Sequence, residues 1–141
     1  MADIFDLYFT IGNTHKLEKN PKLTKQGNMR NKHNWTAFVR IADRHKPQIK
    51  LGMLVEKVKF QLHETFRPNV RIEKLKKGKE QIEITYSGWG YFDLPVTIYF
   101  KKETGLEPMS VEFELNFDDN GAWRDYKTRI SRKKLGAITK L

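Results

Sequence analysis

Two short segments place imidazole, hydroxyl and aromatic side chains where predicted strands end. The first, residues 63–66, reads His-Glu-Thr-Phe, and the second, residues 87–92, reads Ser-Gly-Trp-Gly-Tyr-Phe. Aromatic faces beside a few polar groups are typical of a slot that binds a ligand by ring contacts and hydrogen bonds. The sequence therefore predicts one binding site formed by both segments.

Within these segments, Trp89 is the best candidate for a wall of the slot. Its neighbours Gly88 and Gly90 carry no side chain that would crowd the ring or the nearby backbone N–H groups. Phe92 is assigned to the core instead, because its parity matches the inward-facing positions of the strand that follows. His63 falls on the polar parity of its strand, so it is either a plain surface histidine or part of the slot.

The elements that position these segments are strands, because apolar residues recur at alternate positions along most of the chain. Residues from about 124 to 141 mix strand and helix periods, which predicts a last strand followed by a short basic helix, or a frayed tail. We expect one all-β domain over 1–141, an immunoglobulin-like antiparallel two-sheet β-sandwich without a disulfide. The alternating runs are Phe5–Ile11, Trp35–Ile41, Val58–Leu62, Ile82–Tyr86, Leu94–Phe100 and Val111–Phe117.

Turn residues separate the predicted strands. Asn120-Gly121 favours a tight hairpin turn, since one of its positions requires a positive φ. The run Asp118 to Gly121 lacks the spaced oxygen ligands and the closing glutamate of a calcium loop. The predicted turns lie at Gly12-Asn13, Asn20-Pro21, Lys77-Gly78, Gly88 with Gly90, Gly105 and Asp118–Gly121.

Composition excludes several kinds of chemistry. The chain has no cysteine, so disulfides, thiolate metal sites and cysteine nucleophiles are absent, and its four histidines lack metal-ligand spacing. No nucleophile elbow or phosphate-binding loop is present, so we expect a binding protein without catalytic residues, metal or cofactor. The start of the chain lacks the features of a secretion signal, and no run is long enough to cross a membrane, which predicts an intracellular protein.

The order of four motifs resembles the YEATS domain family, over residues from about 17 to about 129. The second and third motifs are specific, because His-Glu-Thr-Phe after a strand, then Gly-Trp-Gly with a nearby Phe, is not a general sandwich pattern. The motifs are His33–Arg40, Val55–Phe66, Ser87–Phe92 and Leu94–Phe100.

The resemblance implies a nuclear chromatin reader that binds acetyl-lysine, and crotonyl-lysine in many members, on histone tails, within a chromatin-modifying or transcription complex. By this similarity, Phe66 and Trp89 would sandwich the acyl amide, Thr65 would hydrogen-bond it, and the backbone N–H of Trp89 would meet the acyl oxygen. An acyl group removes the charge of the lysine, and a neutral planar amide suits a slot between rings. The implied acyl-lysine site comprises His63, Thr65, Phe66, Gly88, Trp89, Gly90 and Tyr91.

Two positions depart from the family pattern. Family members carry an aromatic residue where this chain has Asn31, and an acidic residue used for peptide contact where it has Asn116. Asn31 and Asn116 are therefore candidate peptide contacts, with a thinner pocket wall at the first and weaker pairing with a basic tail at the second.

The net charge of +10 predicts a polyanionic neighbour. Two basic runs are candidate contacts with nucleosomal DNA, although such runs are often a solvated face or a nuclear-import signal. The alternative function is a basic β-sandwich that binds nucleic acid or an acidic protein partner without recognising acyl-lysine; a hydrolase or transferase has no assembled site. The candidate DNA contacts are Lys74, Lys76, Lys77, Lys79, Arg129, Arg132, Lys133 and Lys134.

Overall fold

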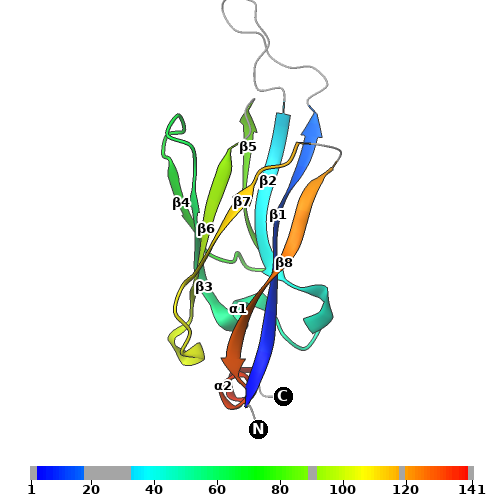
Figure 1. Cartoon of the computed structure of the whole chain (residues 1–141), viewed down its shortest axis with the longest axis vertical. Coiled ribbons are helices and arrows are strands. Elements are labelled where there is room, and N and C mark those ends of the chain that lie inside the picture. Colours follow the sequence, from blue (N-terminus) through cyan, green and yellow to red (C-terminus); the bar gives the residue numbers. More distant parts are fainter. Residues whose placement is uncertain (1–2, 18–32, 89–91, 118–119, 140–141) are drawn as a thin grey trace, which may run out of the picture.

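The computed structural model describes residues 3–17, 33–88, 92–117 and 120–139 and forms two layers of antiparallel strands (Figure 1). One sheet has the order β5-β2-β1-β8, and the other has the order β4-β3-β6-β7. The all-β sandwich prediction is confirmed. The strands are β1 Ile4–Leu17, β2 His33–Ile41, β3 Val55–Gln61, β4 Val70–Glu73, β5 Gln81–Gly88, β6 Asp93–Phe100, β7 Met109–Glu114 and β8 Gly121–Ser131; the helices are α1 Leu51–Leu54 and α2 Arg132–Thr139, with 3-10 turns η1 Asp43–His45 and η2 Lys102–Thr104.

The apolar residues that alternate along the sequence are buried between the two sheets. In β6 every second residue is buried, as are the apolar positions of β3 that face it. Trp35 of β2 is only 2% exposed and is among the largest side chains in the core. Burying one face of each sheet against the other is the main favourable contribution to folding. The buried positions of these three strands are Trp35, Ala37, Val39, Ile41, Val55, Val58, Phe60, Leu94, Val96, Ile98 and Phe100.

The expected turn at Gly12-Asn13 is wrong, because both residues lie inside the long strand β1. Gly12 is required there by a close approach: a Cβ on it would overlap the carbonyl oxygen of Ala122 and the Cβ of Trp123 on β8. Asn13 is fully buried and bonds to the backbone of the loop after β7 instead of turning its own chain.

The expected hairpin at Asn120-Gly121 is also wrong. Gly121 does have a positive φ of 107°, as predicted for this position. However, β7 pairs with β6 in one sheet and β8 pairs with β1 in the other, so the chain crosses between the layers here. Which sheet a strand joins depends on contacts distant in the sequence, and a two-residue turn signal does not specify them.

Two elements differ from the six expected runs. The short strand β4 was not predicted, because it lies at a sheet edge and all of its residues are exposed or half-buried. At the C-terminal end, the strand-then-helix alternative is correct: β8 continues to Ser131, and α2 follows with Leu135 buried against the core.

The alternating direction of the strands gathers the connections at two opposite ends of the sandwich. The ends of β3, β5 and β7 and the start of β6 lie at one end, which we call the upper end after Figure 1. The segments 42–54, 74–80 and 101–108, helix α2 and the start of β1 lie at the lower end. The two ends are separated by the length of β3, about 20 Å at the usual strand rise.

His45 is a buried polar group near the lower end. Its Nε2 accepts a hydrogen bond from the backbone N–H of Tyr8 at 3.0 Å, and its ring lies 5.4 Å from that of Phe5. Burial, and then the positive charge of Arg44, lower the pKa of His45, while Asp125 acts in the opposite direction. The folded protein therefore favours neutral His45.

This environment predicts a loss of stability in weak acid. The contribution of His45 is fully present above its unfolded pKa of about 6.5 and is lost as the pH falls toward its lower folded-state pKa, because the unfolded chain takes up the proton first. Thermal melts of the wild type between about pH 7 and pH 5 should show this decline. His45→Gln, whose amide oxygen can replace Nε2 as acceptor, should reduce the slope, whereas the exposed-site control His63→Gln should keep it. Equal slopes in all three proteins would contradict the assignment.

Candidate functional site

The chain turns at the upper end immediately after β3. Leu62 donates its backbone N–H to the carbonyl of Asn69 at 2.7 Å, and Phe66 donates to the carbonyl of His63 at 3.0 Å. The Arg67 guanidinium donates to the carbonyl oxygens of Glu64 and Phe66 and so ties the turn from outside. The turn presents His63 and Thr65 to solvent and leaves Phe66 half-buried.

His63 and Thr65 form a local hydrogen-bonded pair. The Thr65 backbone N–H donates to His63 Nδ1 at 3.2 Å, and the Thr65 Oγ1 lies 3.0 Å from the same nitrogen. With Nδ1 accepting from the backbone N–H, the Thr65 hydroxyl is the group that carries the proton in the second contact. The Thr65 side chain is exposed, and its Oγ1 retains the capacity to accept a further hydrogen bond.

Phe66 packs edge-on into an aromatic cluster. Its ring centroid lies 5.0 Å from that of Tyr86, 5.7 Å from that of Phe92 and 6.4 Å from that of Trp35. The Phe92 ring lies in turn 6.0 Å from that of His63. Edge-to-face packing of this kind fixes ring orientation, so the cluster holds Phe66 in place.

Sequence reasoning missed the supporting roles of Trp35 and Tyr86. These residues lie directly opposite each other in the β2–β5 register, with ring centroids 5.6 Å apart. Their inward parity could be deduced from the alternation, but the register that pairs them could not. Phe92, predicted to be core, is half-buried. It packs on Trp35 in the core and also borders His63 at the candidate site.

Arg71 fastens Tyr86 from the neighbouring sheet edge. Its guanidinium donates to the Tyr86 hydroxyl at 2.7 Å and to Glu73 Oε2 at 2.8 Å. The hydrogen bond to Tyr86, and then the one to Glu73, raise the pKa of Arg71 above its usual value. This link joins β4 of one sheet to β5 of the other beside the aromatic cluster, and no sequence signal indicated it.

The predicted second segment begins two residues later than expected. Strand β5 continues past Tyr86 to Gly88, which pairs with His33 at the start of β2. Gly88 therefore lies at the same upper end as the 63–66 turn, as the site prediction requires. The remaining predicted residues Trp89, Gly90, Tyr91 and Asn31 lie outside the described residues, as do the expected turn at Asn20-Pro21 and Asp118 and Asp119.

Asn116 also belongs to the upper end. Leu115 donates its N–H to the carbonyl of Phe92 at 3.2 Å, which joins the end of β7 to the aromatic cluster. Asn13 then accepts from the N–H of Asn116 at 2.9 Å and donates to its carbonyl at 2.7 Å. The buried Asn13 amide thus fixes the backbone of Asn116.

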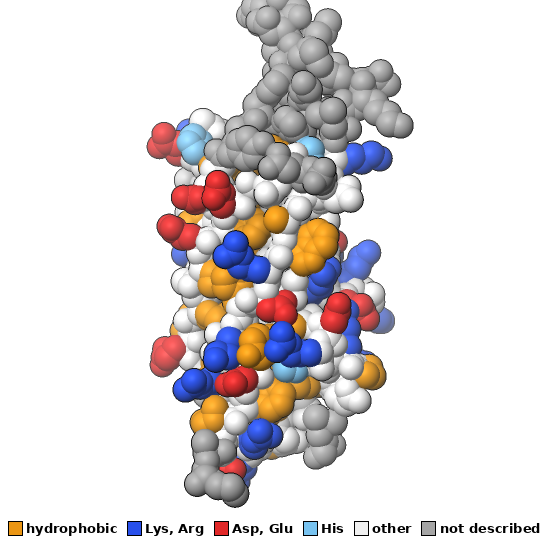
Figure 2. Space-filling view, turned by 45° about the vertical axis from the view of Figure 1, so that its right-hand side comes forward, with side chains coloured by type: hydrophobic (Ala, Val, Ile, Leu, Met, Phe, Trp, Pro, Cys, Tyr) orange, Lys and Arg blue, Asp and Glu red, His pale blue; other side chains and the backbone are white. Residues whose placement is uncertain are grey.

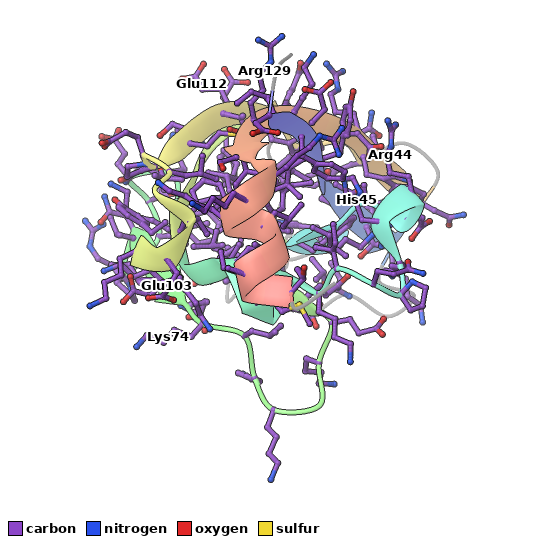
Figure 3. The ribbon with its side chains drawn as sticks, turned by 90° about the horizontal axis from the view of Figure 1, so that it is seen from below. Arg44, His45, Lys74, Glu103, Glu112 and Arg129 are labelled. Carbon is purple, nitrogen blue, oxygen red and sulfur yellow. The ribbon has the colours of Figure 1, made fainter. Side chains whose placement is uncertain are left out.

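The candidate DNA contacts do not join this site. The run containing Lys74 and the run containing Arg132 lie at the lower end, on the 74–80 connection and on α2. Arg129 lies on β8 within 3.6 Å of Asp6, and Figure 3 places it on the opposite side of that end from Lys74. Both basic runs are therefore separate from the acyl-lysine candidates, and Arg129, the first residue of the second run, lies across that end from Lys74.

The described residues show neither a metal-binding cluster nor a membrane-spanning helix. They contain no group of three or more His, Asp or Glu side chains that could hold a metal ion. No helix among them is long and apolar enough to cross a lipid bilayer.

Comparison with known families decides the identity of the domain. Residues 30–119 match the sequence model of the YEATS family. The chain belongs to this family. The match contains the 63–66 turn, the end of β5 and Asn116, so the upper end lies within the shared YEATS region.

Similar proteins include a transcription initiation factor subunit and AF-9 homologs. The chain is 28% identical over 102 residues to the Arabidopsis thaliana transcription initiation factor TFIID subunit 14b, covering 70% of this chain and 35% of that protein. It is 36% identical over 72 residues to the Saccharomyces cerevisiae protein AF-9 homolog, covering 50% of this chain and 28% of that protein. The chain thus spans about a third of the length of these relatives.

Solved YEATS structures share the fold. The Yaf9 YEATS domain recognising an H3K122suc peptide has a TM-score of 0.75 with 22% identity, covering 97% of this chain and 94% of that one. The Yaf9 YEATS domain bound to H3K27ac has a TM-score of 0.72 with the same identity and coverage. The YEATS sandwich architecture expected from the sequence is confirmed.

Proposed function

We propose that the upper end of this YEATS domain binds acylated lysine on histone tails. The observation that carries the proposal is that Thr65 adjoins Phe66: an exposed hydroxyl bonded to His63 is followed by an aromatic ring held by its neighbours. A planar secondary amide needs both features, an acceptor for its N–H and an apolar face against its plane.

Each residue of the proposed site makes a different contact with the acyl-lysine. Thr65 Oγ1, with its proton donated to His63, accepts from the amide N–H of the acyl-lysine. Phe66 covers one face of the amide, and by family resemblance Trp89 covers the other and meets the acyl oxygen with its backbone N–H. His63 and Gly88 shape the slot, Gly90 and Tyr91 belong to the proposed site by family resemblance, and Asn31 and Asn116 contact the peptide beside it. An unmodified ammonium would lose its hydration shell against these rings, which favours the neutral acyl form.

The relatives support this function. The Yaf9 YEATS domains in the structural comparison are complexes with succinylated and acetylated histone H3 peptides, and the similar full-length proteins are a TFIID subunit and AF-9 homologs. We extend this to the present chain as a nuclear reader that acts in a chromatin-modifying or transcription complex, without catalysis. An open end of the slot would admit crotonyl-lysine as well as acetyl-lysine.

A peptide series tests the proposal. Histone H3 peptides that differ in one lysine, either unmodified, acetylated, crotonylated or trimethylated, are titrated calorimetrically against the domain. The acyl peptides should bind, and the unmodified and trimethylated peptides should bind at least about tenfold more weakly, since a trimethylammonium has no N–H for Thr65. Phe66→Ala should remove the difference. Equal affinity for all four peptides would refute acyl recognition and favour the alternative of a basic sandwich that binds a polyanion.

We also propose that the outward-facing cations of the lower end contact nucleosomal DNA. Lys74, Lys76 and Lys77 are exposed on the 74–80 connection, and Arg132 and Lys133 are exposed on α2. On the face in Figure 2, by contrast, Lys and Arg side chains alternate with Asp and Glu. The DNA contact is therefore assigned to the lower end and not to that face.

DNA binding should be independent of sequence and steeply dependent on salt. Each phosphate contact contributes about −0.9 to the slope of log K against log salt, because binding releases condensed counterions. Anisotropy titrations of unrelated duplexes at low and physiological salt should give equal affinities that fall together, while acyl-peptide affinity changes little. Lys76→Glu/Lys77→Glu should reduce the slope, whereas Lys127→Glu on β8 should not. Strong preference for one duplex would contradict this assignment.

A further inference from the structure

A groove of about 880 Å³ lies at the lower end of the sandwich, away from the 63–66 turn. Its walls come from the segment before β3 with α1, from the 74–80 connection, from η2, and from α2. Figure 3 looks onto this end, where α2 crosses the middle, with Glu103 and Lys74 on one side and Arg44 and His45 on the other. The groove shares no residue with the proposed acyl-lysine site.

The floor of the groove is apolar. Met53, Leu75 and Ile138 are half-buried, so they pack on the core with one part of the side chain and border the groove with another. Ile49 and Leu51 are buried beneath them. A concave apolar surface of this volume is of the kind that binds ligands, because covering it releases water from apolar atoms.

The rim of the groove is cationic. Five lysines and two glutamates line it, a balance of 5 − 2 = +3. Lys46 is paired with Asp43 at 3.5 Å and Glu80 at 3.7 Å, whereas the other four lysines form no ion pair with another described residue. Uncompensated cations around a concavity concentrate positive potential there. The lysines are Lys46, Lys50, Lys79, Lys101 and Lys134, and the glutamates are Glu80 and Glu103.

An apolar floor inside a cationic rim indicates what kind of ligand the groove would bind. We propose that the groove binds an acidic, amphipathic segment of a partner protein, whose apolar side chains cover the floor while its carboxylates pair with the free lysines. A duplex presents phosphates on a convex cylinder and offers nothing apolar to Met53 and Ile138. Peptide recognition by an apolar groove with charged rims is a recurrent mode of docking. Because the groove and the acyl site are at opposite ends, both can be occupied together.

The position and chemistry of binding are testable by NMR with the isotope-labelled domain. The probe is a synthetic peptide of Asp, Glu, Leu and Phe with apolar residues at i, i+3, i+4 and i+7. Two matched peptides replace Leu and Phe by Ser, or Asp and Glu by Asn and Gln. Chemical-shift changes should lie in 46–53, 75–80, 101–103 and 134–138, and each matched peptide should bind at least about fivefold more weakly. Shifts elsewhere, or equal binding of the Ser peptide, would overturn the proposal.

Substitutions distinguish the contribution of the cationic rim from that of the apolar floor. Lys50→Glu should weaken the amphipathic peptide about fivefold at low salt, and Ile138→Ser should weaken it to a similar extent at all salt concentrations. Lys127→Glu, an equal charge reversal at an exposed site of β8, is the matched control and should change nothing. A thermal melt of each variant checks folding and keeps this test independent of the proposed function. Displacement of the probe by duplex DNA or by anionic phospholipid vesicles, with shifts in the same residues, would assign the groove to phosphate ligands instead.

Discussion

Thr65→Val is expected to reduce the affinity for an acetylated histone peptide by about 5- to 150-fold. Valine keeps the shape of threonine but removes the acceptor, so the amide N–H of the ligand is buried without a partner, at a cost of about 1–3 kcal/mol. Thr65 is exposed in the free domain, so the melting temperature should change little. Calorimetric titration with the acetylated peptide measures the effect.

Thr65→Ser is the matched control for this prediction. Serine retains the hydroxyl that lies 3.0 Å from His63 Nδ1, so most of the affinity should remain. The affinity of His63→Gln should lie between those of Thr65→Val and Thr65→Ser. This change removes the imidazole acceptor that orients the hydroxyl but leaves Thr65 in place. Wild-type affinity in Thr65→Val would exclude Thr65 as the amide acceptor, even if Phe66→Ala still abolished binding.

Trp35→Ala is expected to have the largest effect on stability. Trp35 is 2% exposed and packs against Phe66, Tyr86 and Phe92, so its removal leaves a cavity that the surrounding rings cannot fill. Aromatic-to-alanine changes in a core cost about 3–5 kcal/mol. The melting temperature should therefore fall by roughly 10–20 °C, as measured by a thermal melt.

Trp123→Ala provides the comparison within the same sheet. Trp123 lies on β8 with 50% of its surface exposed and covers the ring of Phe38 from outside, at a centroid distance of 6.4 Å. Trp123→Ala should lower the free energy of unfolding by well under half as much as Trp35→Ala. Trp35→Phe should recover part of the stability and part of the acyl affinity, because a smaller ring still supports Phe66. A mild effect of Trp35→Ala would show that the cluster repacks around the cavity.

The candidate site could be predicted in part because its residues are clustered in the sequence. The 63–66 turn follows an alternating strand, and strand parity alone placed His63 outside and Phe60 inside, as the structure has them. The pairing of His63 with Thr65 is a contact between near neighbours. Local geometry of this kind is specified by a few adjacent residues, so a sequence pattern can indicate it.

The support behind the site could not be predicted in the same way. Trp35, Tyr86 and Arg71 are distant from Phe66 in the sequence and reach it through the β2–β5 register and the contact of two sheet edges. The groove at the lower end could not be predicted from the sequence either, because its lysines come from four separate segments. They are Lys50, Lys79, Lys101 and Lys134. In the sequence two of these lysines belonged to basic runs assigned to DNA.

The sequence by itself determined the period of the strands, the all-β class, the residues of the 63–66 turn and the absence of cysteine chemistry. Only the tertiary structure decided that Gly12 lies within a strand, that β7 and β8 belong to different sheets, and that the basic runs lie opposite the proposed acyl-lysine site. The physical reason is the range of the interactions. Side-chain parity and turn preference act between neighbours along the chain, whereas register, sheet membership and the meeting of loops follow from burying both sheets in one core.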